Sequence, residues 1–438
     1  MKVVKFGGTS VGSAQRMKHV ANLISQDSTP KIIVLSAVSG TTNSLVAIAE
    51  SIEKGKPEEA LQKIVQLKTS YEVLVSELVS QTATQQKAQA ILEEHFGLLE
   101  AQAKMVYSDS MQRLIVAQGE LLSTKLFMLY LEEAQIAAEW WYAPDFMQID
   151  SFKEPLIPQL RAGVMDKVKA SPQHLFITQG FICVNEKGEI DNLKRGGSDY
   201  SATLIGAAIS AEEVQIWTDI DGMHNNDPRV VENTYPIAEL SFDEASELAY
   251  FGAKILHPSS IWPVQKFNVP VRLLNTMQPE ARGTYISAKT GQEEVKALAA
   301  KDGITAIKIK SSRMILAYGF LRKIFEIFEN YRTSIDMITT SEVAVSVTID
   351  DNTYIEPILA ELQKLGTVEV DYNQTIVCIV GNLVADSKGI VKKVFDSLED
   401  IPVRMISYGG SKNNISLLVD VSQKVKALKQ LNKGLFQN

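Results

Sequence analysis

The chain begins with residues suited to binding a phosphate group: Lys5 is followed by the pair Gly7-Gly8 and by Thr9 and Ser10. Apolar residues before the glycines predict a buried strand, and apolar residues from 17 to 24 recur at helical spacing. A glycine turn between a strand and a helix N-terminus gathers backbone N–H groups where the helix dipole favours negative charge. Lys5 would add a mobile positive charge. The pattern also fits a simple turn with positive φ at glycine, so on this stretch alone both interpretations are open.

A second Gly-Gly pair stands at residues 196–197, with Arg195 before it and a predicted helix after it. Two further polar stretches, Thr41–Asn43 and Gly119–Glu120, are predicted at turns where a helix begins. The polar loop Thr218–Arg229 follows another predicted strand. The carboxyl ends of parallel strands meet at one edge of a sheet, and ligands of α/β proteins bind there. These polar stretches therefore predict one ligand site at that edge.

The composition is typical of a globular protein with two or three domains, since 45% of the 438 residues are hydrophobic and 22% are charged. The net charge of −8, from 44 basic and 52 acidic residues, argues against a general nucleic-acid binder. Cys183 and Cys378 lie far apart in apolar runs, which indicates buried free thiols in a reducing compartment. No signal-peptide pattern and no uninterrupted apolar run of about 18 residues is found. We therefore expect a cytoplasmic protein that binds no membrane, and the scattered His and Cys residues predict no metal held by protein side chains.

Alternating strands and helices predict an α/β first domain with a mainly parallel sheet, over residues 1–294. A helix is predicted over residues 241–258. The polar, turn-rich stretch 276–294 marks the expected domain boundary. The predicted strands of this domain cover residues 3–6, 31–37, 176–184, 214–218 and 269–274, the last of these being the final strand.

The remainder of the chain is predicted to form two ferredoxin-like βαββαβ repeats, over residues 295–372 and 373–438. The second copy lacks its final strand, and residues 295–299 would supply it, so that the two copies share strands. The first copy is predicted to have strands at 304–310, 334–339, 343–349 and 368–370 and helices at 320–330 and 354–364. The second is predicted to have strands at 376–380, 403–406 and 415–419 and helices at 389–398 and 425–431.

Neither G-x-x-x-x-G-K-[ST] nor G-x-G occurs, so the phosphate site is not of the common nucleotide-binding types. The chain resembles the aspartokinases of the amino acid kinase superfamily, and most of all the lysine-sensitive monofunctional type. The set of motifs is specific because it spans the whole chain in the expected order. The matching stretches are KFGGTSV (5–11), SGTTN (39–43), QGE (118–120), ITQGF (177–181), RGGSDYSA (195–202), WTD (217–219), DPRVV (227–231), FGAKILHP (251–258) and ITTSEV (338–343).

The resemblance implies a three-layer amino acid kinase sandwich followed by two ACT domains. It implies ATP-dependent phosphorylation of the β-carboxylate of L-aspartate to 4-phospho-L-aspartate, the first step toward lysine, threonine and methionine. Lys5 would stabilise charge on the transferred phosphoryl group, and Asp199 would orient Lys5 through an ion pair. No general base is needed, because a carboxylate with a pKa of about 3.9 is already ionised near neutrality.

The resemblance also assigns binding residues for both substrates. Arg195 would grip the α-carboxylate of aspartate and Glu120 its α-ammonium, although Glu120 alone also fits a carboxylate that complements a helix dipole. Other aspartate-binding residues are expected to be Thr42, Phe181, Gly196, Gly197 and Ser198. ATP-binding residues are expected to be Lys5, Phe6, Gly7, Gly8, Thr9, Ser10, Thr218, Asp219, His224, Arg229 and Lys254, with His224 standing where the family commonly has Tyr. Mg²⁺ would bridge the ATP phosphates with few protein ligands.

The C-terminal repeats resemble the ACT domains that sense amino acids in this family, at an interface between subunits. Asp336 and Glu342 would receive a lysine ammonium, and backbone N–H groups near Gly319 would take the carboxylate. The remaining effector-binding positions are expected to be Met314, Phe320, Thr340 and Ser341. The resemblance implies a homodimer or higher oligomer formed through these domains.

Three alternatives remain at this level. The chain is a feedback-inhibited aspartokinase, another enzyme of the superfamily, or an amino-acid sensor that has lost catalysis. Lysine is the expected effector, with threonine or no effector as alternatives.

Overall fold

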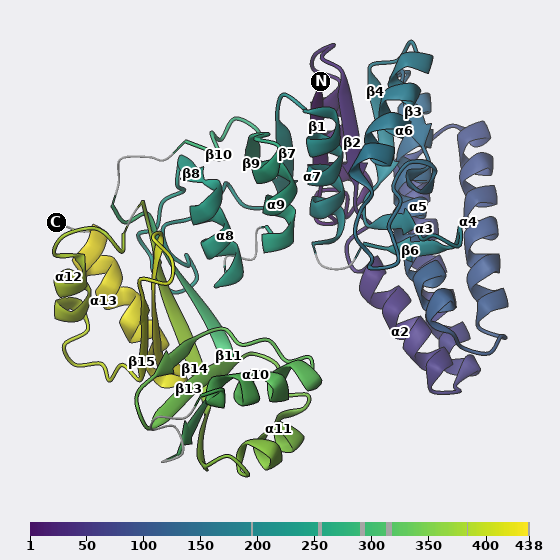
Figure 1. Ribbon diagram of the computed structural model, residues 1–438. Helices are drawn as coiled ribbons and strands as arrows, with labels where there is room; N and C mark the ends of the chain where they lie inside the picture. Colours follow the sequence, from purple (N-terminus) through teal and green to yellow (C-terminus); the bar gives the residue numbers. More distant parts are fainter. Residues whose placement is uncertain (194–195, 253–255, 290–293, 312–317, 383, 437–438) are drawn as a thin grey trace. The chain divides into compact units, whose positions relative to one another are not determined.

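In the computed structural model, residues 1–193, 196–252, 256–289, 294–311, 318–382 and 384–436 are described (Figure 1). The chain forms two compact units. The first comprises Met1–Met223, Ala238–Phe242 and Ile255–Lys289, and the second comprises His224–Ile237, Asp243–Lys254 and Thr290–Asn438.

The first unit is built on an eight-stranded sheet in the order β3-β4-β2-β1-β7-β9-β10-β8. All neighbouring strands are parallel except β10, which runs antiparallel to β9. Strands buried on both faces need near-continuous apolar runs, as in KIIVL of β2. The strands are β1 (Lys2–Phe6), β2 (Lys31–Leu35), β3 (Glu139–Trp141), β4 (Leu175–Gln179), β7 (Val214–Thr218), β8 (Glu239–Ser241), β9 (Val271–Asn275) and β10 (Thr284–Ser287); β5 (Ile182–Val184) and β6 (Ile190–Asn192) form a separate hairpin.

Helices cover both faces of this sheet, which confirms the predicted three-layer α/β fold. One large apolar core joins α1–α5 to side chains of β1, β2 and β4. On the other side α7 packs against β1, α6 and α9. The helices are α1 (Ala14–Ile24), α2 (Thr41–Glu53), α3 (Pro57–Leu78), α4 (Thr82–Gln102), α5 (Asp109–Glu133), α6 (Ile157–Ala170), α7 (Gly197–Ile209) and α9 (Pro258–Lys266), with a short 3₁₀ turn at Ala143–Asp145.

Helix α5 is long and apolar enough to cross a membrane if only its length and composition are considered. However, 78% of its most apolar window is buried inside the protein. It packs against α2, α4, β3 and β4, so its apolar surface is used by the core of the first unit.

The second unit contains a six-stranded antiparallel sheet in the order β12-β13-β11-β14-β16-β15. The two central strands are long, and each serves both ferredoxin-like halves: Ala297–Lys301 of β11 pair with Ile376–Val380 of β14. The strands are β11 (Ala297–Lys310), β12 (Ile338–Thr340), β13 (Ala344–Ile349), β14 (Thr367–Val380), β15 (Met405–Tyr408) and β16 (Asn414–Asp420). The helices are α8 (Phe242–Tyr250), α10 (Phe320–Asn330), α11 (Ile355–Leu362), α12 (Ile390–Ser397) and α13 (Lys424–Phe436), with a 3₁₀ turn at Val421–Gln423.

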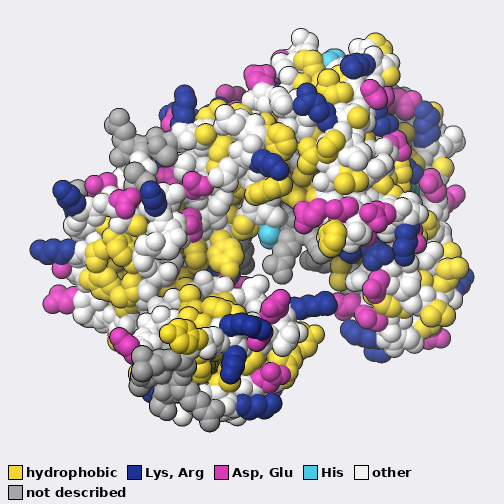
Figure 2. All heavy atoms as spheres, in the orientation of Figure 1, with side chains coloured by type: hydrophobic (Ala, Val, Ile, Leu, Met, Phe, Trp, Pro, Cys, Tyr) yellow, Lys and Arg dark blue, Asp and Glu magenta, His cyan; other side chains and the backbone are white. Residues whose placement is uncertain are grey.

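The surface in Figure 2 carries Lys and Arg side chains interspersed with Asp and Glu side chains. The two cysteines are buried free thiols, as predicted.

Several predicted element boundaries are wrong. The apolar run 176–184 is broken at Phe181, whose φ of 67° is incompatible with a continuing strand. The helix predicted over 241–258 ends at Tyr250, and α9 begins only at Pro258. Val271–Asn275 is not the last strand, because Thr284–Ser287 forms β10 between β9 and β8, within the stretch expected to be a linker. The strands predicted at 368–370 and 376–380 are parts of one strand, β14.

Candidate active site and regulatory site

The turn after β1 is shaped for close approach by a ligand. A side chain at Gly8 would bring its Cβ within 2.9 Å of the Ala37 carbonyl oxygen, so only glycine fits there. Neither Gly7 nor Gly8 has positive φ, so close packing rather than backbone handedness explains this pair. The N–H groups of Ser10 and Val11 donate to the Gly7 carbonyl, whereas those of Gly8 and Thr9 donate to no described residue. The turn therefore leaves two backbone N–H groups available to bind a ligand.

Lys5 stands at the base of this turn and forms an ion pair with the first turn of α7. Its Nζ lies 2.5 Å from Oδ1 of Asp199, and the two side chains are 11% and 16% exposed. Parallel pairing of β1 with β7 and packing of α7 against β1 bring the two residues together. This geometry supports the predicted pairing of Lys5 with Asp199.

The position of Glu120 differs from the prediction. Gly119 and Glu120 lie in the middle of α5, not at a turn where a helix begins, so a helix-dipole role for Glu120 is excluded. A Cβ at Gly119 would meet the Ala37 side chain at 2.9 Å, so the glycine lets α5 approach the end of β2 closely. The Ala37 N–H donates to Oε1 of Glu120 at 3.4 Å. Residue 37 thus contacts both the phosphate turn and the Glu120 carboxylate.

Glu120 has a buried carboxyl group with one oxygen that lacks a hydrogen-bond partner among the described residues. Only 3% of the residue is exposed, and its Oε2 atom has no hydrogen-bond partner among the described residues. Burial raises the pKa of Glu120 to about 8, although the Ala37 N–H works in the opposite direction. A ligand ammonium beside Oε2 would supply both the missing hydrogen bond and the missing positive charge.

The β4 end and the α7 N-terminus meet tightly beside these groups. A Cβ at Gly180 would lie 2.3 Å from the Cβ of Ser198, so glycine is required there. The N–H of Phe181 donates to the Ser201 hydroxyl at 2.7 Å. Gly196 caps α7 with φ 92°, and Gly197 follows with φ 51°, so this second glycine pair does need positive φ. Thr42 lies in the first turn of α2, while Arg195 lies outside the described residues.

The predicted nucleotide residues fall in both units. Thr218 and Asp219 follow β7 in the first unit, where the Thr218 hydroxyl donates to the Asp219 carboxylate at 3.1 Å. His224 and Arg229 belong to the second unit. The His224 ring nitrogen Nδ1 lies 3.0 Å from the Thr234 hydroxyl, and the Arg229 guanidinium makes two hydrogen bonds to Asp227. Lys254 lies outside the described residues.

Thr276 is a site residue that the sequence did not single out. Its hydroxyl lies 2.6 Å from the Ser10 hydroxyl, and its N–H donates to the Thr218 carbonyl. His19 on α1 donates to the Thr276 carbonyl at 2.8 Å. Thr276 therefore ties the phosphate turn to the ends of β7 and β9, a role that no local sequence pattern reveals.

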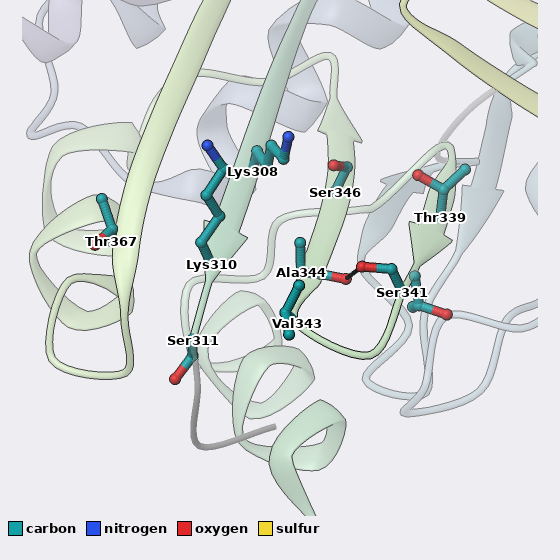
Figure 3. A pocket seen from close by; sticks show the side chains of 10 residues that line it. Lys308, Lys310, Ser311, Thr339, Ser341, Val343, Ala344, Ser346 and Thr367 are labelled. Atoms are coloured by element: carbon teal, nitrogen blue, oxygen red, sulfur yellow. Dashed lines mark hydrogen bonds between the residues drawn. The ribbon is translucent and has the colours of Figure 1, made fainter. Parts of the chain in front are cut away.

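The predicted effector residues are only partly brought together. Thr340 and Ser341, at the β12–β13 turn, line a cavity of about 600 Å³ with Lys308 and Lys310 of β11 (Figure 3). Asp336 and Glu342 do not line it, Gly319 and Phe320 form the N-terminus of α10, and Met314 lies outside the described residues. The Asp336 carboxylate is already paired with Lys301 of the same chain. Burial disfavours the charged Lys301, but hydrogen bonds to Asp350 and Asp336 together raise its pKa.

No group of three or more His, Cys, Asp or Glu side chains able to hold a metal occurs among the described residues.

Comparisons with known proteins identify the family of the chain. The amino acid kinase family model matches residues 1–275, and an ACT domain model matches residues 377–435. The lysine-sensitive aspartokinase 3 of Escherichia coli K12 is 36% identical over 448 residues, covering 99% of each chain.

Solved structures of E. coli aspartokinase III match the whole chain at 35% identity, covering 100% of both chains. The TM-score is 0.86 for the complex with aspartate and ADP (R-state) and 0.81 for the complex with lysine and aspartate (T-state). The family match, the full-length relative and the shared fold lead to one conclusion: the chain belongs to the aspartokinases of the amino acid kinase family.

Proposed function

We propose that this aspartokinase transfers the γ-phosphoryl group of ATP to the β-carboxylate of L-aspartate beside the Lys5–Asp199 pair. The observation that carries the proposal is this ion pair, 2.5 Å long, at the base of a glycine turn with two unused N–H donors. The buried carboxyl of Glu120 accepts a hydrogen bond from the Ala37 N–H at Oε1, and its Oε2 would bind the substrate ammonium.

In the reaction, a β-carboxylate oxygen of aspartate forms a bond to the γ-phosphorus. The bond from that phosphorus to the β,γ-bridging oxygen breaks, and ADP leaves with the electron pair. Lys5 neutralises charge on the transferred phosphoryl oxygens, while the N–H groups of Gly8 and Thr9 bind phosphate oxygens. Asp199 holds the Lys5 ammonium in place. No proton has to be removed, because the attacking carboxylate is ionised at neutral pH.

The amino-acid substrate is bound by groups of both charges. Glu120 pairs with the α-ammonium through Oε2, and Arg195 grips the α-carboxylate with a bidentate contact. Thr42 and Phe181 complete the pocket, and the N–H groups of residues 196–198 lie at the α7 N-terminus, where the helix dipole favours an anion.

For the nucleotide, Phe6 and Ser10 complete the phosphate turn, and Thr218, Asp219, His224, Arg229 and Lys254 bind the remainder of ATP. Arg229 would have to exchange its two hydrogen bonds to Asp227 for nucleotide oxygens. Mg²⁺ enters as the ATP complex and supplies further neutralisation of phosphate charge.

Residues 1–294 form the catalytic domain, and residues 295–372 and 373–438 form two ACT domains that bind lysine as a feedback inhibitor. The effector-binding residues are Met314, Gly319, Phe320, Asp336, Thr340, Ser341 and Glu342. Asp336 and Glu342 receive the lysine ammonium, and backbone N–H groups near Gly319 bind the carboxylate. The ACT domains also form the contact between two subunits of a homodimer or a higher oligomer. The enzyme works in the cytoplasm, without a membrane or nucleic-acid partner.

The test is an assay of ADP release with aspartate, glutamate or acetylglutamate as acceptor, each with and without lysine or threonine. We expect turnover with aspartate and inhibition by lysine. Turnover with another acid and none with aspartate would contradict the substrate assignment. Inhibition by threonine alone would contradict the effector assignment while leaving the substrate assignment intact.

A further inference from the structure

The Asp336 carboxylate is enclosed by groups of its own chain. Its side chain is 0% exposed, and its Oδ1 accepts hydrogen bonds from Lys301 Nζ at 3.0 Å and from the Tyr250 hydroxyl at 2.6 Å. The second oxygen, Oδ2, is buried and has no hydrogen-bond partner among the described residues. A carboxylate in this state has unused capacity for one more donor.

Lys301 is shared between two carboxylates. Its Nζ lies 2.8 Å from Asp350 Oδ2 as well as 3.0 Å from Asp336, and 4.4 Å from the centre of the Tyr250 ring. One ammonium thus faces two carboxylates, which leaves this cluster with a formal charge of −1. An additional ammonium group would balance the charge.

Tyr250 connects this cluster to helix α8. It is the last residue of α8. Two other residues of this helix contact the six-stranded sheet or the residue before it: Glu244 pairs at 2.8 Å with Lys296, which precedes β11, and Glu247 accepts a hydrogen bond from Asn414 of β16. The chain passes from the first compact unit to the second at the start of α8, directly after β8 of the catalytic sheet. The Tyr250–Asp336 bond therefore joins a predicted effector residue to a segment that the amino acid kinase family model includes.

We propose that Lys301 and Tyr250 are internal competitors of the effector ammonium for the Asp336 carboxylate, and so set how tightly the effector binds. The proposal rests on the assignment of Asp336 to the effector site. Although Oδ2 could accept another hydrogen bond, the side chain is fully enclosed, so an incoming ammonium reaches the carboxylate only by displacing one of these donors. Lys301 keeps Asp350 as a partner when displaced, and Tyr250 is a 40% exposed residue, so water can solvate its hydroxyl after displacement.

The competition fixes the direction of mutational effects. Each internal bond to Asp336 that breaks on effector binding lowers the affinity for the effector. Removing a competitor therefore makes the enzyme more sensitive to lysine. If Tyr250 or Lys301 instead helped to hold the effector, its removal would make the enzyme resistant.

The principal variant is Tyr250→Phe, which removes only the hydroxyl group. We expect the dissociation constant for lysine to fall about 10-fold, the size expected for one hydrogen bond to a charged group. It is measured by calorimetry on the full-length enzyme. The lysine concentration that gives half inhibition should fall by the same factor. Tyr354→Phe is the matched control, because Tyr354 is half-exposed and its ring packs against Tyr331 instead of the Asp336 cluster. We expect this control to bind lysine as the wild type does.

A second variant, Lys301→Gln, removes the competing charge and leaves two carboxylates to attract the effector. We expect it to bind lysine more tightly as well, with the melting temperature measured to verify folding. Unchanged or weaker lysine binding in Tyr250→Phe would overturn the competition. If the wild type does not bind lysine, or Asp336→Asn binds it undiminished, the effector assignment fails and the inference fails with it.

Discussion

The Lys5 ammonium and the Asp199 carboxylate lie 2.5 Å apart, although β1 and the start of α7 are distant in the chain. Asp199 stands in the first turn of α7, where the helix dipole also stabilises its negative charge. The pair holds one positive charge beside the N–H donors of the glycine turn. A lysine held in this way loses little conformational freedom when the phosphoryl group arrives, which is the advantage of preorganised electrostatic stabilisation.

Replacing Lys5 with Met should lower kcat by roughly 10²–10³-fold, the typical loss when a preorganised charge or donor is removed from a transition state. The measurement is ADP release at saturating ATP and aspartate. Lys2→Met, at the other end of the same strand, is the control and should retain wild-type kcat. A Lys5 variant with near-normal kcat and an unchanged melting temperature would exclude Lys5 from the phosphoryl-transfer step.

Glu120 should produce a pH dependence in aspartate binding. Its pKa of about 8 means that the free enzyme holds this group protonated at neutral pH, whereas pairing with an ammonium requires the carboxylate. We therefore expect kcat/KM for aspartate to rise as the pH increases through about 8, and to level off above it. In Glu120→Gln this rise should disappear and the KM for aspartate should increase. An identical pH profile in the variant would contradict the assignment.

The same group should affect the stability of the unliganded protein. The folded-state pKa of about 8 exceeds the ordinary value of 4.5, so the folded protein binds more protons than the unfolded chain between these values. The contribution of Glu120 to stability is present below pH 4.5 and is lost as the pH rises toward 8. Denaturant unfolding at several pH values should show a smaller decrease in Glu120→Gln than in the wild type.

The Ser10–Thr276 contact predicts that a residue remote in sequence positions the phosphate turn. Thr276→Val removes a buried hydroxyl contact of 2.6 Å, and we expect the KM for ATP to rise about 5–10-fold, as for one hydrogen bond. The KM for aspartate should change little. Thr69→Val, at an exposed position on α3, is the matched control. Equal increases in both KM values would indicate general destabilisation instead of positioning.

Two glycines should respond oppositely to alanine. At Gly180 the added Cβ would lie 2.3 Å from Ser198, so Gly180→Ala should destabilise the fold by about 1–3 kcal/mol and raise the KM for aspartate. Gly97 lies exposed inside α4 with nothing within 4 Å of its Cβ position. Gly97→Ala should therefore stabilise the protein by about 0.5–1 kcal/mol. Thermal unfolding of both variants tests the pair.

Local pattern predicted the elements whose signals lie within a few residues. The apolar spacing of residues 17–24 identified the buried face of α1, and α10 has the predicted bounds, 320–330. The secondary-structure prediction failed where contacts with segments distant in the chain determine the local structure. Gly119 looks like a helix breaker in sequence, but in α5 it permits close contact with Ala37. Thr284–Ser287 is a strand because β8 and β9 offer open edges to pair with, and its own residues do not reveal this.

The sequence by itself determined the alternation of strands and helices, the two glycine turns and the family to which the motifs point, because each of these is carried by residue types at short spacing. Only the tertiary structure revealed the contacts that the motifs did not indicate. It buried Glu120 in the middle of α5 beside Ala37, added Thr276 to the phosphate turn and enclosed Asp336 with Lys301 and Tyr250. The physical reason is that burial and charge pairing arise between segments distant in the chain. Sheet order and helix packing set those contacts, and no short stretch of sequence encodes them.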